Sequence, residues 1–310
     1  MSTAQFEKET DKKGAFVRQA SAFRESVTAD GSSGFKAEPG RYHLYVSYAC
    51  PWASRAIIYR KLKGLEDVIS MTVVDPVRDD QGWRFLDDDP DPINGYEYLL
   101  DAYLKTDPDF SDRVTVPVLW DKDSNRAVNN ESSEIIRMLN TEFNEWAKNP
   151  ELDFYPEALR EEIDEINDRV YNSINNGVYR AGFATTQEAY EEAFIDLFQA
   201  LDEIDDRLAA KRYLTGDSIT EADWRLFVTL VRFDAVYVGH FKCNQRRIAD
   251  YDNLSGYLRE LYQHPGVRET VEMDHIKRHY YVTHPKINPT QIVPMGPELD
   301  LDSDPGRGHL

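Results

Sequence analysis

Short apolar runs dominate the first half of the chain and predict strands. The runs 42–47, 68–74 and 114–120 are rich in β-branched and aromatic side chains, which is typical of buried strands. A helix is predicted over 51–63, between the first two runs, and Gly64 follows its end as a residue suited to terminating a helix. This order predicts a β-α-β opening.

The remainder of the first half is less regular. Residues 75–113 are long and polar, with a helix predicted around 96–104. A very short strand is predicted over 127–129, followed by a helix through Leu139 that Asn129 or Asn130 caps. Pro117 lacks an N–H and is a poor member of a central ladder, so it marks an edge, a bulge or a cis turn.

Apolar residues recur at helical spacing after Pro156. Thr220 and Asp223 have the spacing of a capping box and open a further helix. The tail after His284 is rich in proline and acid, and we expect extended coil there. The apolar positions of the predicted helices are Leu159, Ile163, Ile166, Val170 and Ile174; Ala193, Phe194, Leu197, Phe198, Leu201, Ile204 and Leu208; Trp224, Phe227, Leu230 and Val231; and Leu254, Tyr257, Leu258 and Leu261.

The pattern therefore predicts a mixed α/β half followed by an all-α half. The predicted segments are an N-terminal extension (1–41), an α/β domain (42–140), a linker (141–157), a helical domain (158–285) and a C-terminal tail (286–310).

The charge of the chain is strongly negative, with 36 basic against 56 acidic residues and a net charge of −20. Such a surface repels nucleic acid and anionic membranes, so we expect neither as a partner. The acidic residues are spread evenly, which suggests a solvation strategy. We hypothesise a halophilic adaptation to a salty cytoplasm, where salt screens the repulsion between carboxylates.

The cysteine content and the lack of long apolar runs support a cytoplasmic location. The chain has 2 cysteines far apart in sequence, which is no disulfide framework and fits a reducing compartment. No apolar run approaches the length of a membrane-spanning helix, and residues 1–10 lack the apolar stretch of a signal peptide.

Cys50 is the first candidate for chemistry. It lies where the first strand breaks and the first helix starts, followed by Pro51, and a helix N-terminus favours thiolate over thiol. The alternative is a buried, inert cysteine. Ala53 occupies the position of a second cysteine, so Cys50 would act alone: it forms a mixed disulfide with a small thiol, which a second thiol releases. Cys243 has no helix-start features, and we expect a structural role.

Glu131 and Ser132 begin a predicted helix and allow two interpretations. They could simply cap the helix. Alternatively, backbone N–H groups and the Ser132 hydroxyl could bind a carboxylate while Glu131 neutralises an ammonium. His275 and His279 have a spacing that can bind metal, but no third ligand is evident and Lys277 lies between them. We expect no metal.

The β-α-β opening, Cys50, Pro117 and the acid-serine helix start together resemble the thioredoxin-like half of glutathione transferases. Longer blocks, in family order, resemble the glutathionyl-hydroquinone reductase family, the Xi class. These blocks are CPWA (50–53), VTVPVLWD (114–121), NNESSEII (129–136), NNGVYRAGFA (175–184), VYVGHFKCN (236–244) and HIKRHYY (275–281).

The resemblance implies an α/β N-terminal thioredoxin-like domain plus an all-α C-terminal domain. It implies glutathione-dependent reduction of S-glutathionyl-hydroquinones to hydroquinones and glutathione disulfide through a Cys50 mixed disulfide, in a homodimer. The alternatives are a general thioltransferase or dehydroascorbate reductase, and a non-catalytic binding scaffold. γ-Glutamylcysteine could replace glutathione, because both carry the same γ-glutamyl end.

The resemblance also implies the residues of each site. Around the quinol, Tyr179 is the expected proton donor, and Tyr237 and Tyr280 support it, because phenolic O–H groups can hydrogen-bond the ring oxygens and supply a proton. Trp83 could instead pack its loop, and Arg113 could be a solvated charge. The implied glutathione site comprises Trp83, Arg113, Val114, Thr115, Val116, Pro117, Glu131 and Ser132.

Overall fold

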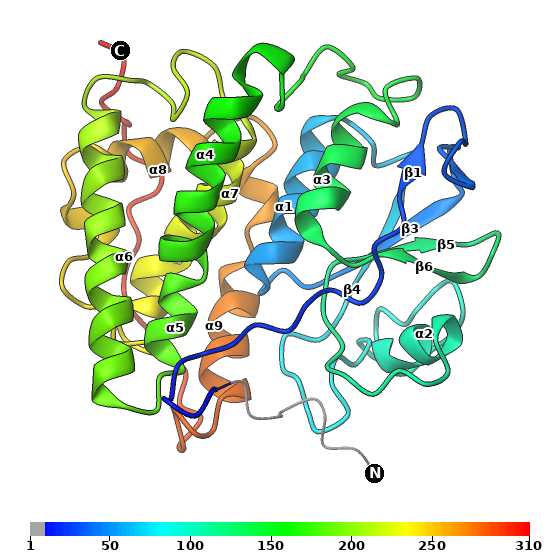
Figure 1. Ribbon diagram of the computed structural model, residues 1–310, viewed down its shortest axis with the longest axis horizontal. Coiled ribbons are helices and arrows are strands. Elements are labelled where there is room, and N and C mark those ends of the chain that lie inside the picture. The colour runs from blue at the N-terminus through cyan, green and yellow to red at the C-terminus, as the bar shows by residue number, and fades with distance from the viewer. Residues whose placement is uncertain (1–9) are drawn as a thin grey trace. The chain divides into compact units, whose positions relative to one another are not determined.

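The computed structural model describes residues 10–310, which form two compact units (Figure 1). Unit 1 contains Gln19–Asp153 and Glu269–His284, and unit 2 contains 10–18, Phe154–Arg268 and Pro285–Leu310. Residues 1–9 lie outside the described residues; they are the start of the predicted N-terminal extension and most of the segment in which no signal peptide is expected. The predicted segments are continuous in sequence, whereas each compact unit combines stretches that are separate in the sequence. The two divisions are therefore not equivalent, and the predicted segment boundaries stay a prediction.

Unit 1 is built on a four-stranded sheet in the order β4-β3-β5-β6. Its strands are β3 (Tyr42–Val46), β4 (Ser70–Val73), β5 (Val118–Asp121) and β6 (Arg126–Asn129). β3 is parallel to β4 and antiparallel to β5. Helix α1 (Pro51–Leu62) connects β3 to β4, and Gly64 beyond its end has a φ of +65°, so the predicted β-α-β opening is confirmed.

Three more helices belong to unit 1: α2 (Leu99–Thr106), α3 (Ser132–Thr141) and α9 (Met273–Thr283). α1 and α3 lie side by side (Figure 1). The prediction that Asn129 or Asn130 caps α3 is wrong, because Glu131 is the N-cap and Asn129 ends β6. The predicted strand 114–120 starts only at Val118, because the cis Val116–Pro117 bond interrupts the extended run.

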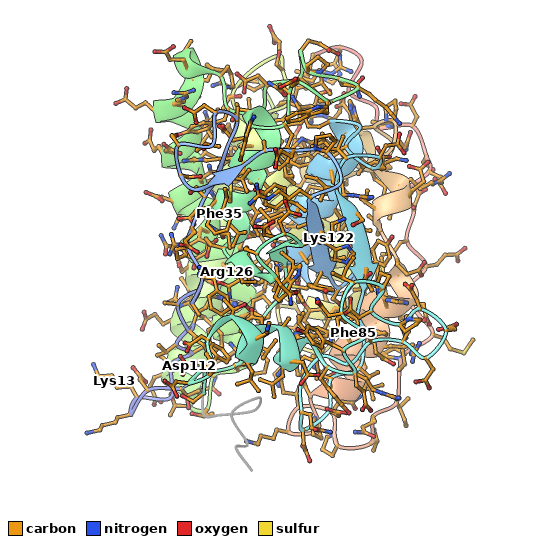
Figure 2. All side chains as sticks on the ribbon, turned by 90° about the vertical axis from the view of Figure 1, so that its right-hand side faces the viewer. Lys13, Phe35, Phe85, Asp112, Lys122 and Arg126 are labelled. Atoms are coloured by element: carbon orange, nitrogen blue, oxygen red, sulfur yellow. The ribbon has the colours of Figure 1, made fainter. Side chains whose placement is uncertain are left out.

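The part of the N-terminal extension that follows Arg18 packs into unit 1. Its strands β1 (Val27–Thr28) and β2 (Phe35–Lys36) form a small parallel sheet. The buried Phe35 ring contacts the Arg126 guanidinium of β6, with 5.8 Å between the guanidinium carbon and the ring centroid (Figure 2). Arg24 forms an antiparallel bridge with Asn129, so residues 23–25 extend the sheet at β6.

Unit 2 is mostly helical, with α4 (Arg160–Val170), α5 (Gly177–Gly182), α6 (Gln187–Leu208), α7 (Glu221–Arg232) and α8 (Leu254–Tyr262). The expected Thr220–Asp223 capping box is present, with Thr220 N donating to Asp223 Oδ2 at 2.7 Å. α7 is buried at every position instead of on one side. Short elements complete the chain: the 3₁₀ turns Glu157–Leu159, Ile248–Asp250 and Arg268–Thr270, and the π-helical turns Tyr171–Asn175 and Phe233–Tyr237.

The C-terminal tail lacks regular structure, as expected, but it is fixed to unit 2 through Arg307. This side chain is 4% exposed. Its Nη2 donates to the carbonyls of Lys211 and Arg212, at 2.9 Å each, just beyond the end of α6. In the part of the chain that the structure describes, no helix is long and apolar enough to cross a membrane.

Candidate active site

Cys50 is the N-cap of α1, with Pro51 as the first helical residue. Its backbone is extended (φ −78°, ψ 120°), and Ser54 N and Oγ donate to the Cys50 carbonyl at 3.0 and 3.1 Å. The Cys50 Sγ is partly exposed and lies 3.5 Å from the Val116 carbonyl oxygen. The strand-to-helix position expected from the sequence is confirmed, and the sulfur lies beside the cis-proline turn.

Cys243 is the opposite case. Its side chain is fully buried, and burial raises the pKa of the Cys243 thiol far above its usual range. The thiol therefore stays protonated and unreactive. This environment matches the structural role expected from the sequence.

The residues before the cis proline, 113–116, form what we term the first limb of the predicted thiol site. The Tyr103 hydroxyl donates to the Thr115 carbonyl at 2.7 Å and accepts from Thr115 N at 3.2 Å. Asn130 Nδ2 donates to the same hydroxyl at 3.0 Å. Tyr103 is completely buried, and burial raises its pKa. The first limb is thereby fixed to the start of α3.

Residues 129–132 form the second limb. Glu131 caps α3 through Oε1, which accepts from Ser133 N at 3.1 Å and from Ser133 Oγ at 2.8 Å. Ser21 Oγ donates to the other oxygen, Oε2, at 2.9 Å. Burial raises the pKa of Glu131, but these hydrogen bonds and the nearby charge of Arg55 outweigh it, and the net pKa is lowered. Glu131 is therefore a stable carboxylate.

Capping and ligand binding are compatible at Glu131. A carboxylate offers about four acceptor positions on its two oxygens, and Ser133 and Ser21 fill three of them. The remaining position is on Oε2. The N-cap role is thus observed, and an acceptor suited to an ammonium group remains.

Arg55 is a site residue that the sequence analysis missed. It lies on α1, is 1% exposed, and its Nη1 donates to Ser132 Oγ at 3.3 Å. Its guanidinium carbon lies 4.6 Å from the Trp52 ring centroid, a cation–π contact. Because Ser132 Oγ accepts from Arg55, its own O–H can donate to a carboxylate. No spacing rule signals this contact, since it joins two helices that are distant in sequence.

Trp83 is 4% exposed and packed within unit 1. Its ring stacks on His279 of α9, with centroids 5.1 Å apart, and the Arg78 guanidinium carbon lies 5.4 Å from its centroid. His279 Nδ1 is 2.6 Å from the Pro76 carbonyl oxygen. Trp83 thus has the loop-packing contacts that the sequence left as its alternative role, and its glutathione role stays a prediction.

Within residues 10–310, no three His, Cys, Asp or Glu side chains form a group that could hold a metal.

The predicted tyrosines fall into two groups. Tyr179 and Tyr237 belong to unit 2, with ring centroids 6.2 Å apart, and Phe241 lies 5.5 Å from each. Tyr237 is fully buried, whereas Tyr179 is partly exposed. Tyr280 lies on α9 in unit 1, the unit that contains Cys50, and is 1% exposed.

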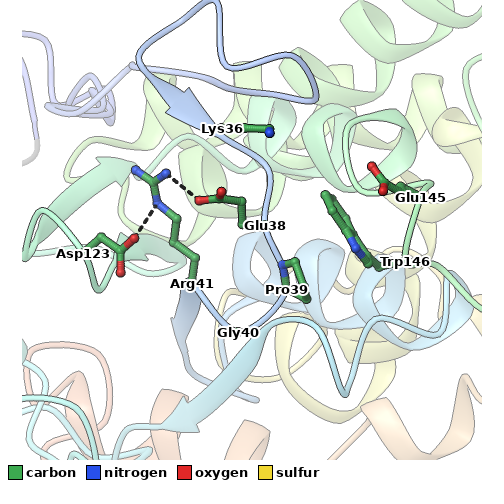
Figure 3. Close-up of a pocket in the computed structure, with 8 residues that line it drawn as sticks. All are labelled: Lys36, Glu38, Pro39, Gly40, Arg41, Asp123, Glu145 and Trp146. Atoms are coloured by element: carbon green, nitrogen blue, oxygen red, sulfur yellow. Dashed lines mark hydrogen bonds and ion pairs between the residues drawn. The ribbon is translucent and has the colours of Figure 1, made fainter.

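A separate surface pocket of unit 1 shares no residue with these groups (Figure 3). Arg41 in this pocket bonds to Glu38 and lies near Asp123, and it donates two hydrogen bonds to the buried Asp121, at 2.8 and 2.9 Å. The Arg41 charge is already neutralised by these carboxylates, so Arg41 is not available as a strong anion-binding group. The lining residues are Lys36, Glu38, Pro39, Gly40, Arg41, Asp123, Glu145 and Trp146.

Comparison with known families defines the class of protein. The family model for the glutathione S-transferase N-terminal domain matches residues 49–142, which include Cys50, both limbs and α3. The model for the glutathione S-transferase C-terminal domain matches residues 187–260. The fold is that of a glutathione transferase.

Individual relatives narrow this class. The glutathionyl-hydroquinone reductase PcpF of Sphingobium chlorophenolicum is 55% identical and covers 93% of this chain and 91% of that protein. The glutathione-bound structure of YqjG from Escherichia coli K-12 is 54% identical, with a TM-score of 0.90 over 92% of this chain and 96% of that one. The glutathione-S-transferase Xi of Phanerochaete chrysosporium is 51% identical, with a TM-score of 0.93 over 98% and 99%. The chain belongs to the glutathionyl-hydroquinone reductase family, the Xi class of glutathione transferases.

Proposed function

We propose that this protein reduces S-glutathionyl-hydroquinones to hydroquinones with glutathione as cosubstrate. The observation that carries the proposal is the placement of Cys50. Its sulfur is at the N-terminal end of α1 and 3.5 Å from the Val116 carbonyl. Ala53 stands one turn further on, so the chemistry uses a single protein thiol.

The reaction has two steps: attack of a thiolate on a thioether sulfur, and then a thiol–disulfide exchange. The Cys50 thiolate attacks the thioether sulfur, so that a Cys50–glutathione disulfide forms and the bond from sulfur to the aromatic carbon breaks. The electron pair stays on the ring, which takes a proton and becomes free hydroquinone. A second glutathione then attacks the mixed disulfide, gives glutathione disulfide and returns Cys50 to its thiolate form. Its thiol proton balances the one that the ring gained.

The remaining residues have binding and proton-transfer roles in this proposal. Glu131 and Ser132 hold the ammonium and carboxylate of the γ-glutamyl end, and Val116 pairs with the cysteinyl backbone. Trp83, Arg113, Val114, Thr115 and Pro117 complete the glutathione site. Tyr179 donates the proton to the ring, with Tyr237 and Tyr280 in support, because phenolic groups can hydrogen-bond the quinol oxygens.

The two cysteines provide a matched test. We expect Cys50→Ala to abolish turnover of S-glutathionyl-menadiol and Cys243→Ala to retain it, because the Cys243 side chain is fully buried and takes no part in the proposed reaction. Mass spectrometry after a single turnover should detect one glutathionyl group on Cys50. Full turnover by Cys50→Ala would refute the Cys50 mechanism, whereas full biological activity of Cys50→Ser without turnover would favour a binding scaffold. Faster turnover of hydroxyethyl disulfide than of S-glutathionyl-menadiol would favour a general thioltransferase.

We further propose that the enzyme works in a salty cytoplasm as a homodimer, without a metal. The net charge of −20 supports the first point, because salt screens carboxylate repulsion. Equal unfolding midpoints in dilute buffer and in molar KCl would count against salt adaptation, and a monomeric mass in light scattering would exclude the dimer. Full activity after chelation is expected. γ-Glutamylcysteine should also serve as the thiol, because it presents the same groups to Glu131 and Ser132.

A further inference from the structure

The N-terminal extension contacts both limbs of the proposed thiol site. Its residues 19–25 lie in unit 1, where 23–25 run beside β6. Gln19 contacts the first limb and Ser21 the second. No site role was expected for this part of the sequence.

Gln19 holds the first limb at two points. Its Nε2 donates to the Arg113 carbonyl at 3.1 Å, and its Oε1 accepts from Arg113 N at 3.1 Å. The side-chain carboxamide therefore pairs with both backbone groups of one residue, as a neighbouring strand would. Two bonds to the N–H and C=O groups of one residue fix the orientation of its backbone as well as its position. Arg113 directly precedes Val114 and the rest of the limb.

Ser21 acts on the carboxylate of the second limb. Its hydroxyl donates to Glu131 Oε2 at 2.9 Å, whereas Ser133 occupies Oε1. Oε2 is the oxygen that retains an acceptor position. Ser21 therefore determines where the oxygen that would receive an ammonium points, and its hydrogen bond helps to lower the pKa of Glu131.

We propose that Gln19 and Ser21 are positioning residues of the thiol site, which orient Arg113 and Glu131 for the γ-glutamyl end of the cosubstrate. This inference rests on the proposed use of Glu131 as the ammonium acceptor. The N-terminal extension is then a working part of the site, and its contribution is selective for thiols that carry a γ-glutamyl group.

The position of the segment does not depend on Ser21 alone. Phe23 N donates to Asn130 Oδ1 at 2.8 Å, Asn130 N donates to the Phe23 carbonyl at 3.0 Å, and the Phe23 ring centroid lies 5.1 Å from that of Tyr103. Glu25 N also donates to the Val128 carbonyl at 3.0 Å. These contacts should keep the segment in place in Ser21→Ala, so loss of one hydroxyl tests position without unfolding.

The experiment forms the Cys50 mixed disulfide with hydroxyethyl disulfide, because its hydroxyethyl group leaves the γ-glutamyl site free. It then compares two thiols as the reductant: glutathione, and 2-mercaptoethanol, which has no ammonium group. We expect Ser21→Ala to lower kcat/KM for glutathione about three- to tenfold, the effect of one hydrogen bond, and to leave 2-mercaptoethanol unchanged. Ser21→Thr, which keeps the hydroxyl, should restore the wild-type ratio. Ser26→Ala makes the same chemical change at an exposed position of the extension and should have no effect.

Gln19→Glu tests the first limb in the same assay. The carboxylate keeps the size of the side chain but cannot donate to the Arg113 carbonyl, so we expect a selective loss with glutathione here as well.

The outcomes separate this inference from the proposed function. Equal rates of the wild type with the two thiols, at equal thiolate concentration, would refute the γ-glutamyl site itself. Discrimination by the wild type that persists unchanged in Ser21→Ala and Gln19→Glu would refute only the positioning role. An equal loss with both thiols would indicate a purely structural role and would also overturn the inference.

Discussion

Replacement of Glu131 by glutamine removes one charge while leaving the local hydrogen bonds possible. In Glu131→Gln, the amide oxygen can still accept from Ser133 N, as Oε1 does in the wild type. The amide nitrogen can donate to Ser21 Oγ, with which Oε2 now makes a 2.9 Å hydrogen bond. The N-cap of α3 is retained, so we expect the free energy of unfolding near neutral pH to fall by no more than about 1 kcal/mol.

The loss should instead appear in the use of glutathione. A hydrogen bond to a charged group is worth about 1.5–3 kcal/mol, so kcat/KM for glutathione should fall by about 10- to 100-fold. The kcat at saturating glutathione should change little, because this interaction binds ground state and transition state alike. Steady-state kinetics with hydroxyethyl disulfide as the fixed substrate gives both constants, because the hydroxyethyl group on Cys50 leaves the γ-glutamyl site free for glutathione.

The pH dependence has a definite sign. The pKa of Glu131 is lowered in the folded protein, so its ionisation stabilises the fold above the pKa of the unfolded chain. This contribution is lost as the pH falls through the lower, folded pKa. The difference in unfolding free energy between the wild type and Glu131→Gln should therefore shrink in acid.

A loss of activity of the same factor with 2-mercaptoethanol, which has no ammonium group, would refute the assigned role of Glu131 as the ammonium acceptor.

Three further perturbations test other parts of the molecule. Arg307→Ala should lower the free energy of unfolding by about 2–3 kcal/mol in a urea titration, because buried hydrogen bonds to carbonyls are lost. The control Arg268→Ala removes an exposed ion pair and should lower the free energy of unfolding by less than about 0.5 kcal/mol. Tyr179→Phe should slow hydroquinone release by at least about 100-fold and leave the attack of glutathione on the mixed disulfide unchanged, as stopped-flow kinetics can test. Arg55→Met should raise the pKa of Glu131, because the charge of Arg55 helps to lower it. When the pH is lowered, the KM for glutathione should therefore begin to rise at a higher pH in Arg55→Met than in the wild type.

The β-α-β opening could be predicted because its determinants are local. The apolar run of β3, Pro51 at the first position of α1 and Gly64 after its end each act within a few residues. The chemistry of Cys50 follows from the same local order, since a residue between a strand and a helix that starts with proline becomes the N-cap.

Elements with ambiguous patterns were placed less well. The apolar run 114–120 has the composition of one strand, but the pairing of β5 starts only after the cis peptide bond at Pro117, and composition does not reveal an isomer. Similarly, the spacing that ends at Ile174 suggests one continuous α-helix. The chain instead changes to a π-helical turn at Tyr171, and one wider turn alters too few positions to change the hydrophobic pattern.

The contacts of the N-terminal extension could not be predicted for a different physical reason. Gln19 uses a side-chain carboxamide to bond the backbone of Arg113, so the partner's side chain is irrelevant and leaves no pattern. Arg18, the preceding residue, belongs to unit 2 and lies with its guanidinium carbon 4.9 Å from the Tyr179 ring centroid. Gln19 thus contacts a predicted thiol-binding residue within unit 1, and Arg18 contacts the predicted proton donor within unit 2. Polar residues such as these are ordinarily solvated, so the hydrophobic pattern of the sequence does not predict where they lie. Their positions depend on partners that are distant in the sequence.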